Sequence, residues 1–148
     1  MKRVLLLGLA VGAVGLVLAS VGAARPAVTV VHVVEHADTD TTTDTGKKGD
    51  SAGDILTFAN PVYDQADRKK VGTDNGYCIR TVAASSYECW WTTFLAKGQL
   101  TIEGPFYDKK SSMLAITGGT GAYANARGWM ALSSKAGGKK YDFVFHIS

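Results

Sequence analysis

Residues 140–148 read KYDFVFHIS, and their alternation decides the fold class. Apolar or aromatic side chains occupy positions 141, 143, 145 and 147, and Asp142, Val144 and His146 stand between them. Successive side chains of a β-strand point to opposite faces, so this period of two predicts a strand with one apolar face. Residues 99–104 (QLTIEG) repeat the pattern, with Leu100 and Ile102 on the apolar side.

Similar short apolar segments, separated by turn residues, recur along most of the chain. We expect eight strands, at residues 28–36, 54–61, 75–82, 86–95, 98–104, 112–117, 124–133 and 140–147. No segment after residue 24 has ten or more residues of helical periodicity, which argues against a parallel sheet with crossover helices. The fold class is therefore all-β. Eight antiparallel strands can close into a β-barrel that encloses a small ligand, and a two-sheet β-sandwich is the alternative.

The first residues are typical of a targeting segment. Lys2 and Arg3 precede an apolar run, and small residues follow at 22–24, which predicts a signal peptide over residues 1–24. The uncharged run could instead remain as a membrane anchor. Either interpretation places the folded part outside the cytoplasmic membrane, so we expect a secreted protein. Without residues 1–24 the chain has 14 basic and 13 acidic residues, a balance that gives no support to nucleic-acid binding.

The rest of the chain reads as one domain with a polar insertion. Residues 25–53 hold the first strand and an Asp/Thr-rich loop, ADTDTTTDTGKKGDSAG at 37–53, that has little to bury and is expected to be flexible. Residues 54–148 form the remainder of the barrel. The aspartates of the loop lack the glycine and the terminal glutamate of an EF-hand, so they predict no metal site.

Two cysteines, Cys78 and Cys89, stand on either side of a predicted turn. If residues 82–85 form the tip of a hairpin, the two cysteines lie directly opposite each other. Opposed residues of an antiparallel pair share a face and can approach disulfide distance. Because an exported protein meets an oxidising environment, we expect a disulfide between them.

Four ordered motifs resemble one known superfamily. They are GDILTFANPVYD (53–64), KKVGTDNGYCIRT (69–81), GQLTIEGPFYD (98–108) and LAITGGTGAYANARG (114–128). The first three and LAITGG are similar to allene oxide cyclases, whereas GGTGAYANARG is similar to the signature of dirigent proteins. The resemblance implies a calycin-type, eight-stranded antiparallel barrel that is commonly a homotrimer.

The same resemblance suggests catalytic residues. Allene oxide cyclases hold a fatty-acid epoxide in an apolar barrel, where a carboxylate and an asparagine assist the reaction, and these roles fall on Glu35 and Asn60. A glutamate in an apolar pocket can acquire a raised pKa and transfer protons, and an asparagine can donate to a developing oxyanion. The alternative is a solvent-facing Glu35 and an Asn60 that only bonds the neighbouring loop. Cys78 matches a cyclase pocket cysteine, but a disulfide would make its role structural.

Further residues are candidates for binding the substrate. Arg127 matches the dirigent arginine and could bind an anion or a phenolic oxygen, or else face solvent. The aromatic candidates are Tyr77, Tyr87 and Trp91, although the alternation does not decide whether the face of Tyr87 and Trp91 or that of Trp90 and Phe94 lines the cavity. Ala37 and Ala122 stand where the cyclases and the dirigent proteins, respectively, have a polar or acidic residue, which argues against either family's full activity.

The sequence therefore predicts a barrel that binds an apolar, oxygenated small molecule, as a cyclase or isomerase if it is an enzyme. A non-catalytic dirigent-like carrier, or an interaction protein with a packed barrel, is the alternative. No cofactor or metal is expected, because His32, His36 and His146 belong to no ligand motif. Gly119, Gly121 and Ala124 match a dinucleotide fingerprint, but no helical pattern follows them, which favours a glycine turn between strands.

Overall fold

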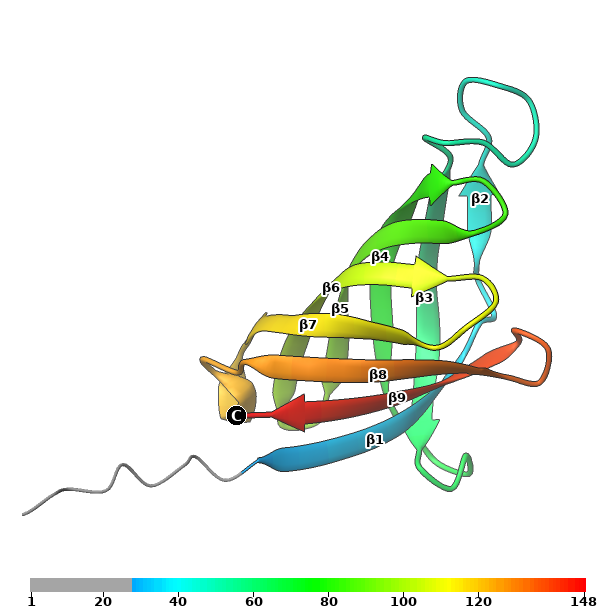
Figure 1. Cartoon of the computed structure of the whole chain (residues 1–148). Coiled ribbons are helices and arrows are strands. Elements are labelled where there is room, and N and C mark those ends of the chain that lie inside the picture. Colours follow the sequence, from blue (N-terminus) through cyan, green and yellow to red (C-terminus); the bar gives the residue numbers. More distant parts are fainter. Residues whose placement is uncertain (1–27) are drawn as a thin grey trace, which may run out of the picture.

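The computed structural model describes residues 28–148, in which antiparallel strands form one sheet that closes on itself (Figure 1). The barrel strands are β1 (Thr29–His36), β3 (Ile55–Asp64), β4 (Lys70–Val82), β5 (Ser86–Leu95), β6 (Gly98–Tyr107), β7 (Ser112–Gly119), β8 (Gly128–Lys135) and β9 (Lys140–Ile147). Each strand from β3 to β9 pairs with the next, and β1 pairs with both β9 and β3. This closure confirms the eight-stranded barrel and excludes the sandwich.

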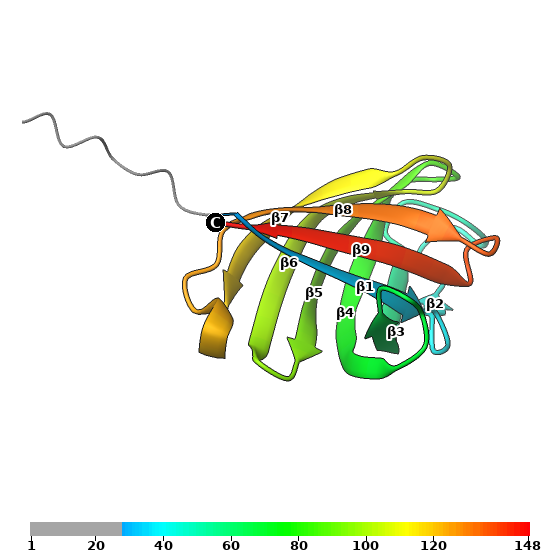
Figure 2. The same ribbon diagram turned by 90° about the horizontal axis from the view of Figure 1, so that it is seen from below.

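The predicted signal peptide, residues 1–24, lies outside the described residues. Across residues 28–148 no helix has the length and apolar character that a membrane crossing requires. The described chain begins beside its own C-terminal end, because Thr29 of β1 pairs with Ile147 of β9 (Figure 2).

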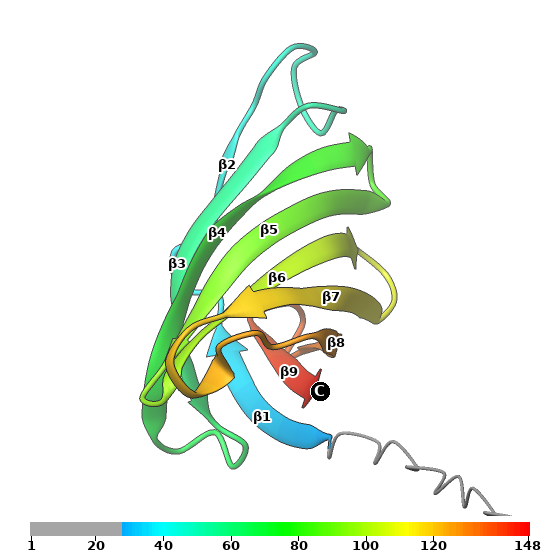
Figure 3. The ribbon, with the colours of Figure 1, turned by 90° about the vertical axis from the view of Figure 1, so that its left-hand side faces the viewer.

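A ninth strand, β2 (Thr41–Thr43), continues the line of β1 along the same side of β3. β1 pairs with the second half of β3 and β2 pairs with its first half, so the two short strands follow each other along β3 (Figure 3). Residues 37–40 interrupt this edge. The interruption matters because it brings side chains of the connecting segment to the barrel interior, as described below.

The Asp/Thr-rich segment 37–53, which we expected to be a flexible loop, contains strand β2. Besides β2, it contains a turn that is held by Asp54, whose carboxylate accepts hydrogen bonds from the backbone N–H groups of Thr45 and Ser51. Asp50 forms an ion pair with Arg80. Short polar side chains order this segment through backbone hydrogen bonds, a contribution that apolar periodicity does not reveal.

The strand that was predicted at residues 124–133 begins later than expected. Residues 121–123 form a 3-10 turn, η1 (Gly121–Tyr123), and β8 begins only at Gly128. Gly121 has a φ of 60°, and a Cβ added at Gly119 would collide with the carbonyl oxygens of Tyr123 and Gln99. The glycines therefore serve a tight turn between strands, as the absence of a helical pattern indicated.

The alternation of β5 has a definite orientation in the barrel. Tyr87, Cys89 and Trp91 point into the barrel and are buried, whereas Trp90 is 49% exposed on the outer face. The inward sets of the other strands complete the core, with Leu100, Ile102, Leu114, Ile116, Met130, Leu132, Phe143, Phe145 and Ile147. The alternating pattern at residues 140–147 thus marks the core face of β9.

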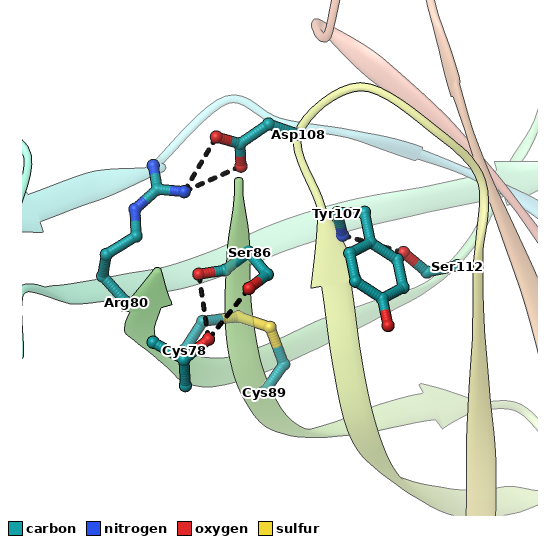
Figure 4. Close-up of a disulfide and its surroundings, with 8 residues drawn as sticks. Cys78, Arg80, Ser86, Cys89, Tyr107, Asp108 and Ser112 are labelled. Atoms are coloured by element: carbon teal, nitrogen blue, oxygen red, sulfur yellow. Dashed lines mark hydrogen bonds and ion pairs between the residues drawn. A yellow bond between two sulfur atoms is a disulfide. The ribbon is translucent and has the colours of Figure 1, made fainter. Parts of the chain in front are cut away.

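Cys78 and Cys89 are opposed in the register of β4 and β5 and form a disulfide, as the hairpin spacing predicts (Figure 4). Replacing both with serine is expected to lower the free energy of unfolding by about 3 kcal/mol, because the crosslink limits the unfolded chain. Urea unfolding of the double variant measures this loss. An unchanged unfolding midpoint would show that the crosslink adds nothing to stability.

Candidate functional site

A pocket opens into the barrel, with a cavity volume of about 60 Å³ inside and about 430 Å³ when the space of its open mouth is counted. Its wall is mainly apolar and aromatic, with Leu56, Phe58, Cys78, Cys89, Trp91, Phe106, Leu132, Tyr141 and Phe143. Glu35 and Asp40 are its acidic lining residues. An apolar pocket with a few polar groups at one place is the usual form of a small-molecule site.

Trp91 supplies the largest side chain of this wall. It packs edge-on to Phe58 and beside Phe143, with ring centroids 6.1 and 5.6 Å away. Gly76 stands opposite Trp91 on β4, and a Cβ added there would collide with the Cβ of Trp91 and the carbonyl oxygen of Trp90. The glycine in NGYC therefore makes room for the indole, so this glycine determines the shape of the cavity.

Glu35 lies on the inner face near the end of β1 and is only 5% exposed. The side-chain amide of Asn60, on β3, donates to Glu35 Oε1 at 2.8 Å and to Asp40 Oδ1 at 2.8 Å. Asn60 Oδ1 accepts from the backbone N–H and the hydroxyl of Thr39, at 2.9 and 3.0 Å. Asn60 thus bridges the break between β1 and β2, and the structure brings together the two residues that the resemblance suggested as catalytic.

Asp74, which stands within the motif KKVGTDNGYCIRT but was not among the predicted site residues, completes this polar group. It lies directly opposite Asn60 on β4, is fully buried, and neither of its carboxylate oxygens has a hydrogen-bond donor among the described residues. Its carboxyl group is close enough to that of Glu35 for their negative charges to repel each other. Asp74 lies four residues before Cys78 on β4, so both side chains point to the same, inner face of the strand. This orientation could have been read from the sequence, but the predicted strand began only at residue 75.

The two buried carboxyl groups shift each other's protonation. Burial raises the pKa of Glu35 to about 7, and the charge of Asp40 adds to the shift against the hydrogen bond from Asn60. Burial and then repulsion from Glu35 raise the pKa of Asp74 well above its usual range. The pair therefore keeps a proton at neutral pH, which suits a group that both accepts and donates protons.

Tyr87 and Tyr77, both predicted to bind substrate, lie elsewhere. Tyr87 is buried, but it lines a separate polar pocket, where the guanidinium of Arg80 lies 3.6 Å from the centre of its ring. Tyr77 is 43% exposed on the outer face, opposite Trp90. Tyr77 therefore faces away from the interior, because its neighbour Cys78 takes the inward position.

Arg127 also lies away from the place that its motif suggested. It is exposed between η1 and β8, its guanidinium donates to the carbonyl of Ala126, and its backbone pairs with Ser148. Glu35 instead pairs with Tyr141, at the other end of β9. Arg127 therefore stands at the opposite end of the barrel and does not join Glu35 and Asn60.

Arg80 is the basic side chain that points inward from β4, two residues after Cys78 (Figure 4). Its guanidinium binds both carboxylate oxygens of Asp108 at 2.8 Å and forms an ion pair with Asp50 at 2.7 Å. Two carboxylates thus neutralise this arginine. They also attach the polar segment around Asp50 to the barrel end.

Comparison with known proteins supports the interpretation of the fold. The family model for allene oxide cyclase matches residues 27–147. A solved structure of a pyocyanin demethylase is similar, with 28% sequence identity and a TM-score of 0.68 over 79% of this chain and 100% of that chain.

Two more distant structures share the fold. A pterocarpan synthase dirigent protein has 21% identity and a TM-score of 0.65, over 84% of this chain and 99% of that one. A Diels-Alderase from Streptomyces koyangensis has 16% identity and a TM-score of 0.66, over 82% of this chain and 63% of that one. The same barrel architecture therefore occurs in proteins that are described as a demethylase, a dirigent protein and a Diels-Alderase.

Proposed function

Because the chain belongs to the allene oxide cyclase family, we propose that its barrel binds an apolar, oxygenated small molecule and that Glu35 exchanges a proton with it. One observation carries the proposal: a carboxyl group with a pKa of about 7 lines an otherwise mainly apolar cavity. The similarity to a pyocyanin demethylase, an enzyme by its name, supports turnover as well as binding.

The residues around Glu35 suit this role. Trp91 and Phe143 would hold the apolar part of the molecule and exclude water, which strengthens every polar interaction in the cavity. Glu35 would then donate its proton to a developing oxyanion, or take one from an acidic C–H or O–H group. Asp74 would stabilise whichever protonation state results, and Asn60 would fix the orientation of the Glu35 carboxyl group. These two are positioning residues.

Native mass spectrometry of the protein isolated from its own culture tests binding, because a retained molecule appears as added mass. The recovered molecule is then incubated in D₂O with the wild type and with Glu35→Gln. We expect the variant to bind the molecule but to lose conversion or deuterium exchange by about 100-fold or more, the usual contribution of a positioned proton-transfer group.

The matched control is Glu88→Gln, which makes the same change on the outer face of β5. It should leave both binding and exchange unchanged. Binding without any conversion or exchange by the wild type would instead indicate a carrier. Equal rates for the wild type and Glu35→Gln would remove Glu35 from the proposal.

We also propose that the protein is exported after removal of residues 1–24 and assembles as a homotrimer. The outer face of β4 and β5 supports assembly, because Tyr77, Ile79 and Trp90 expose apolar surface there. The mass of the secreted protein reports the processing, and light scattering in solution reports the subunit number. A monomer at micromolar concentration would contradict the trimer.

A further inference from the structure

The charged residues at the cavity are all acidic within residues 28–148. Glu35 and the exposed Asp40 line it, and Asp74 lies against Glu35 behind the wall. No lysine, arginine or histidine of the described residues lines the cavity. The negative potential reaches across to β9, since burial and then the charges of Asp40 and Glu35 raise the pKa of the Tyr141 hydroxyl.

Three of the basic side chains near the barrel ends have acidic partners. Arg80 is held between Asp50 and Asp108, and Lys140 donates to Asp67 at 2.6 Å. His36 bonds Asp67 and stacks on Tyr63, away from the cavity lining. Arg80 and Lys140 could neutralise a ligand carboxylate only by breaking these ion pairs.

The aromatic wall offers a second feature that discriminates between ligands. Trp91, Phe143, Phe58 and Phe106 present rings to the same space, and the faces of aromatic rings attract cations. The indole Nε1–H of Trp91 is buried and has no acceptor among the described residues. A ligand oxygen could satisfy it, which matches an oxygenated molecule.

We infer that the ligand of this cavity is an aromatic cation, whose rings lie against Trp91 and Phe143 and whose positive charge faces Asp40 and Glu35. The inference rests on the proposed binding function and narrows its substrate class. A fatty-acid substrate, as the resemblance to allene oxide cyclases implied, carries a carboxylate that this acidic cavity repels. Like charges at close range disfavour binding, so the carboxylates select against anions as well as for cations.

Three fluorescent probes with the same three-ring skeleton test the charge preference. They are N-methylacridinium (a cation), acridine (neutral at about pH 8) and 9-anthracenecarboxylate (an anion), titrated with the full protein at about pH 8, where Glu35 is ionised. We expect the affinity to fall by about tenfold at each step from cation to neutral molecule to anion, an ordinary Coulomb effect at partly solvated distances.

Asp40→Asn is the informative variant. Asp40 is exposed and accepts one hydrogen bond through Oδ1, which an asparagine oxygen can also accept, so folding should be preserved. The variant should lower the affinity for N-methylacridinium by about fivefold to tenfold, leave the affinity for acridine unchanged, and raise the affinity for 9-anthracenecarboxylate. Glu88→Gln on the outer face removes the same charge and should alter none of the three.

Each outcome separates the two proposals. Equal affinity for all three probes, or tightest binding of the anion, would overturn the charge preference and leave the binding barrel standing. If none of the three binds, the assignment of an aromatic cation fails, whereas the binding of an oxygenated molecule is decided separately by native mass spectrometry. An unchanged affinity for the cation in Asp40→Asn would also overturn the assignment, because it would show that the charge of the bound cation lies elsewhere.

Discussion

Replacing Trp91 with alanine is expected to lower the free energy of unfolding by about 3 to 5 kcal/mol, the usual loss when a buried large aromatic side chain is truncated. Trp91 is 3% exposed and contacts Phe58 and Phe143 across the interior. Gly76 already leaves the opposite position without a side chain, so nothing on β4 can fill the space. Urea unfolding followed by circular dichroism measures the change.

The neighbouring tryptophan is a matched control on the same strand. Trp90 is 49% exposed on the outer face, and Trp90→Ala should cost less than about 1 kcal/mol. Trp91→Ala should also weaken the binding of N-methylacridinium, because it removes the largest ring of the wall. Equal destabilisation by the two variants would contradict the inward orientation of Trp91.

The second large effect is a loss of stability as the pH rises from about 5 to about 8. The pKa of Glu35 increases on folding from 4.5 to about 7, so between these values the folded protein binds a proton that the unfolded chain has lost. Stability therefore falls as the pH rises through this interval, and the raised pKa of Asp74 adds to the fall. A shift of this size corresponds to about 3 kcal/mol of unfolding free energy.

Glu35→Gln together with Asp74→Asn should remove this dependence, because amides of the same shape do not titrate. Glu88→Gln, on the outer face, should keep it. Carboxylates with lowered pKa values, such as Asp54 and Asp67, make the folded protein more stable as the pH rises. Their contribution changes only below about pH 4, where these groups become protonated. Chemical unfolding at several pH values measures all three proteins. A wild type that is equally stable at both ends of the range would show that the carboxyl pair is not protonated as described.

Much of the architecture could be predicted, because it depends on local patterns. The alternation at residues 140–147 and in residues 99–104 marks core faces that the barrel confirms, and the spacing of Cys78 and Cys89 follows from a hairpin. Apolar periodicity did not reveal strand β2 in the polar segment 37–53, or the turn in which backbone N–H groups donate to the carboxylate of Asp54.

The candidate site was only half predictable. Family resemblance pointed to Glu35 and Asn60, which are neighbours in the structure, but it also pointed to Arg127, which lies at the other end of the barrel. A motif in the sequence does not show at which end of the barrel its residues lie. Asp74 and Asp40 were not among the predicted site residues, yet Asp74 lies near Glu35 and Asp40 shares Asn60 with it.

The sequence alone determined most of the strands, though not β2 or the first residues of β4, and it determined which cysteines pair and that an apolar interior results. Each of these depends on neighbours along the chain or within one hairpin. The tertiary structure decided that Glu35, Asn60 and Asp74 meet. Their meeting requires β1 to close onto β3 in one register, and a shift by one residue would turn each inward side chain of the strand outward. The raised pKa of Glu35 follows from that closure, because only a closed barrel removes water from both carboxyl groups.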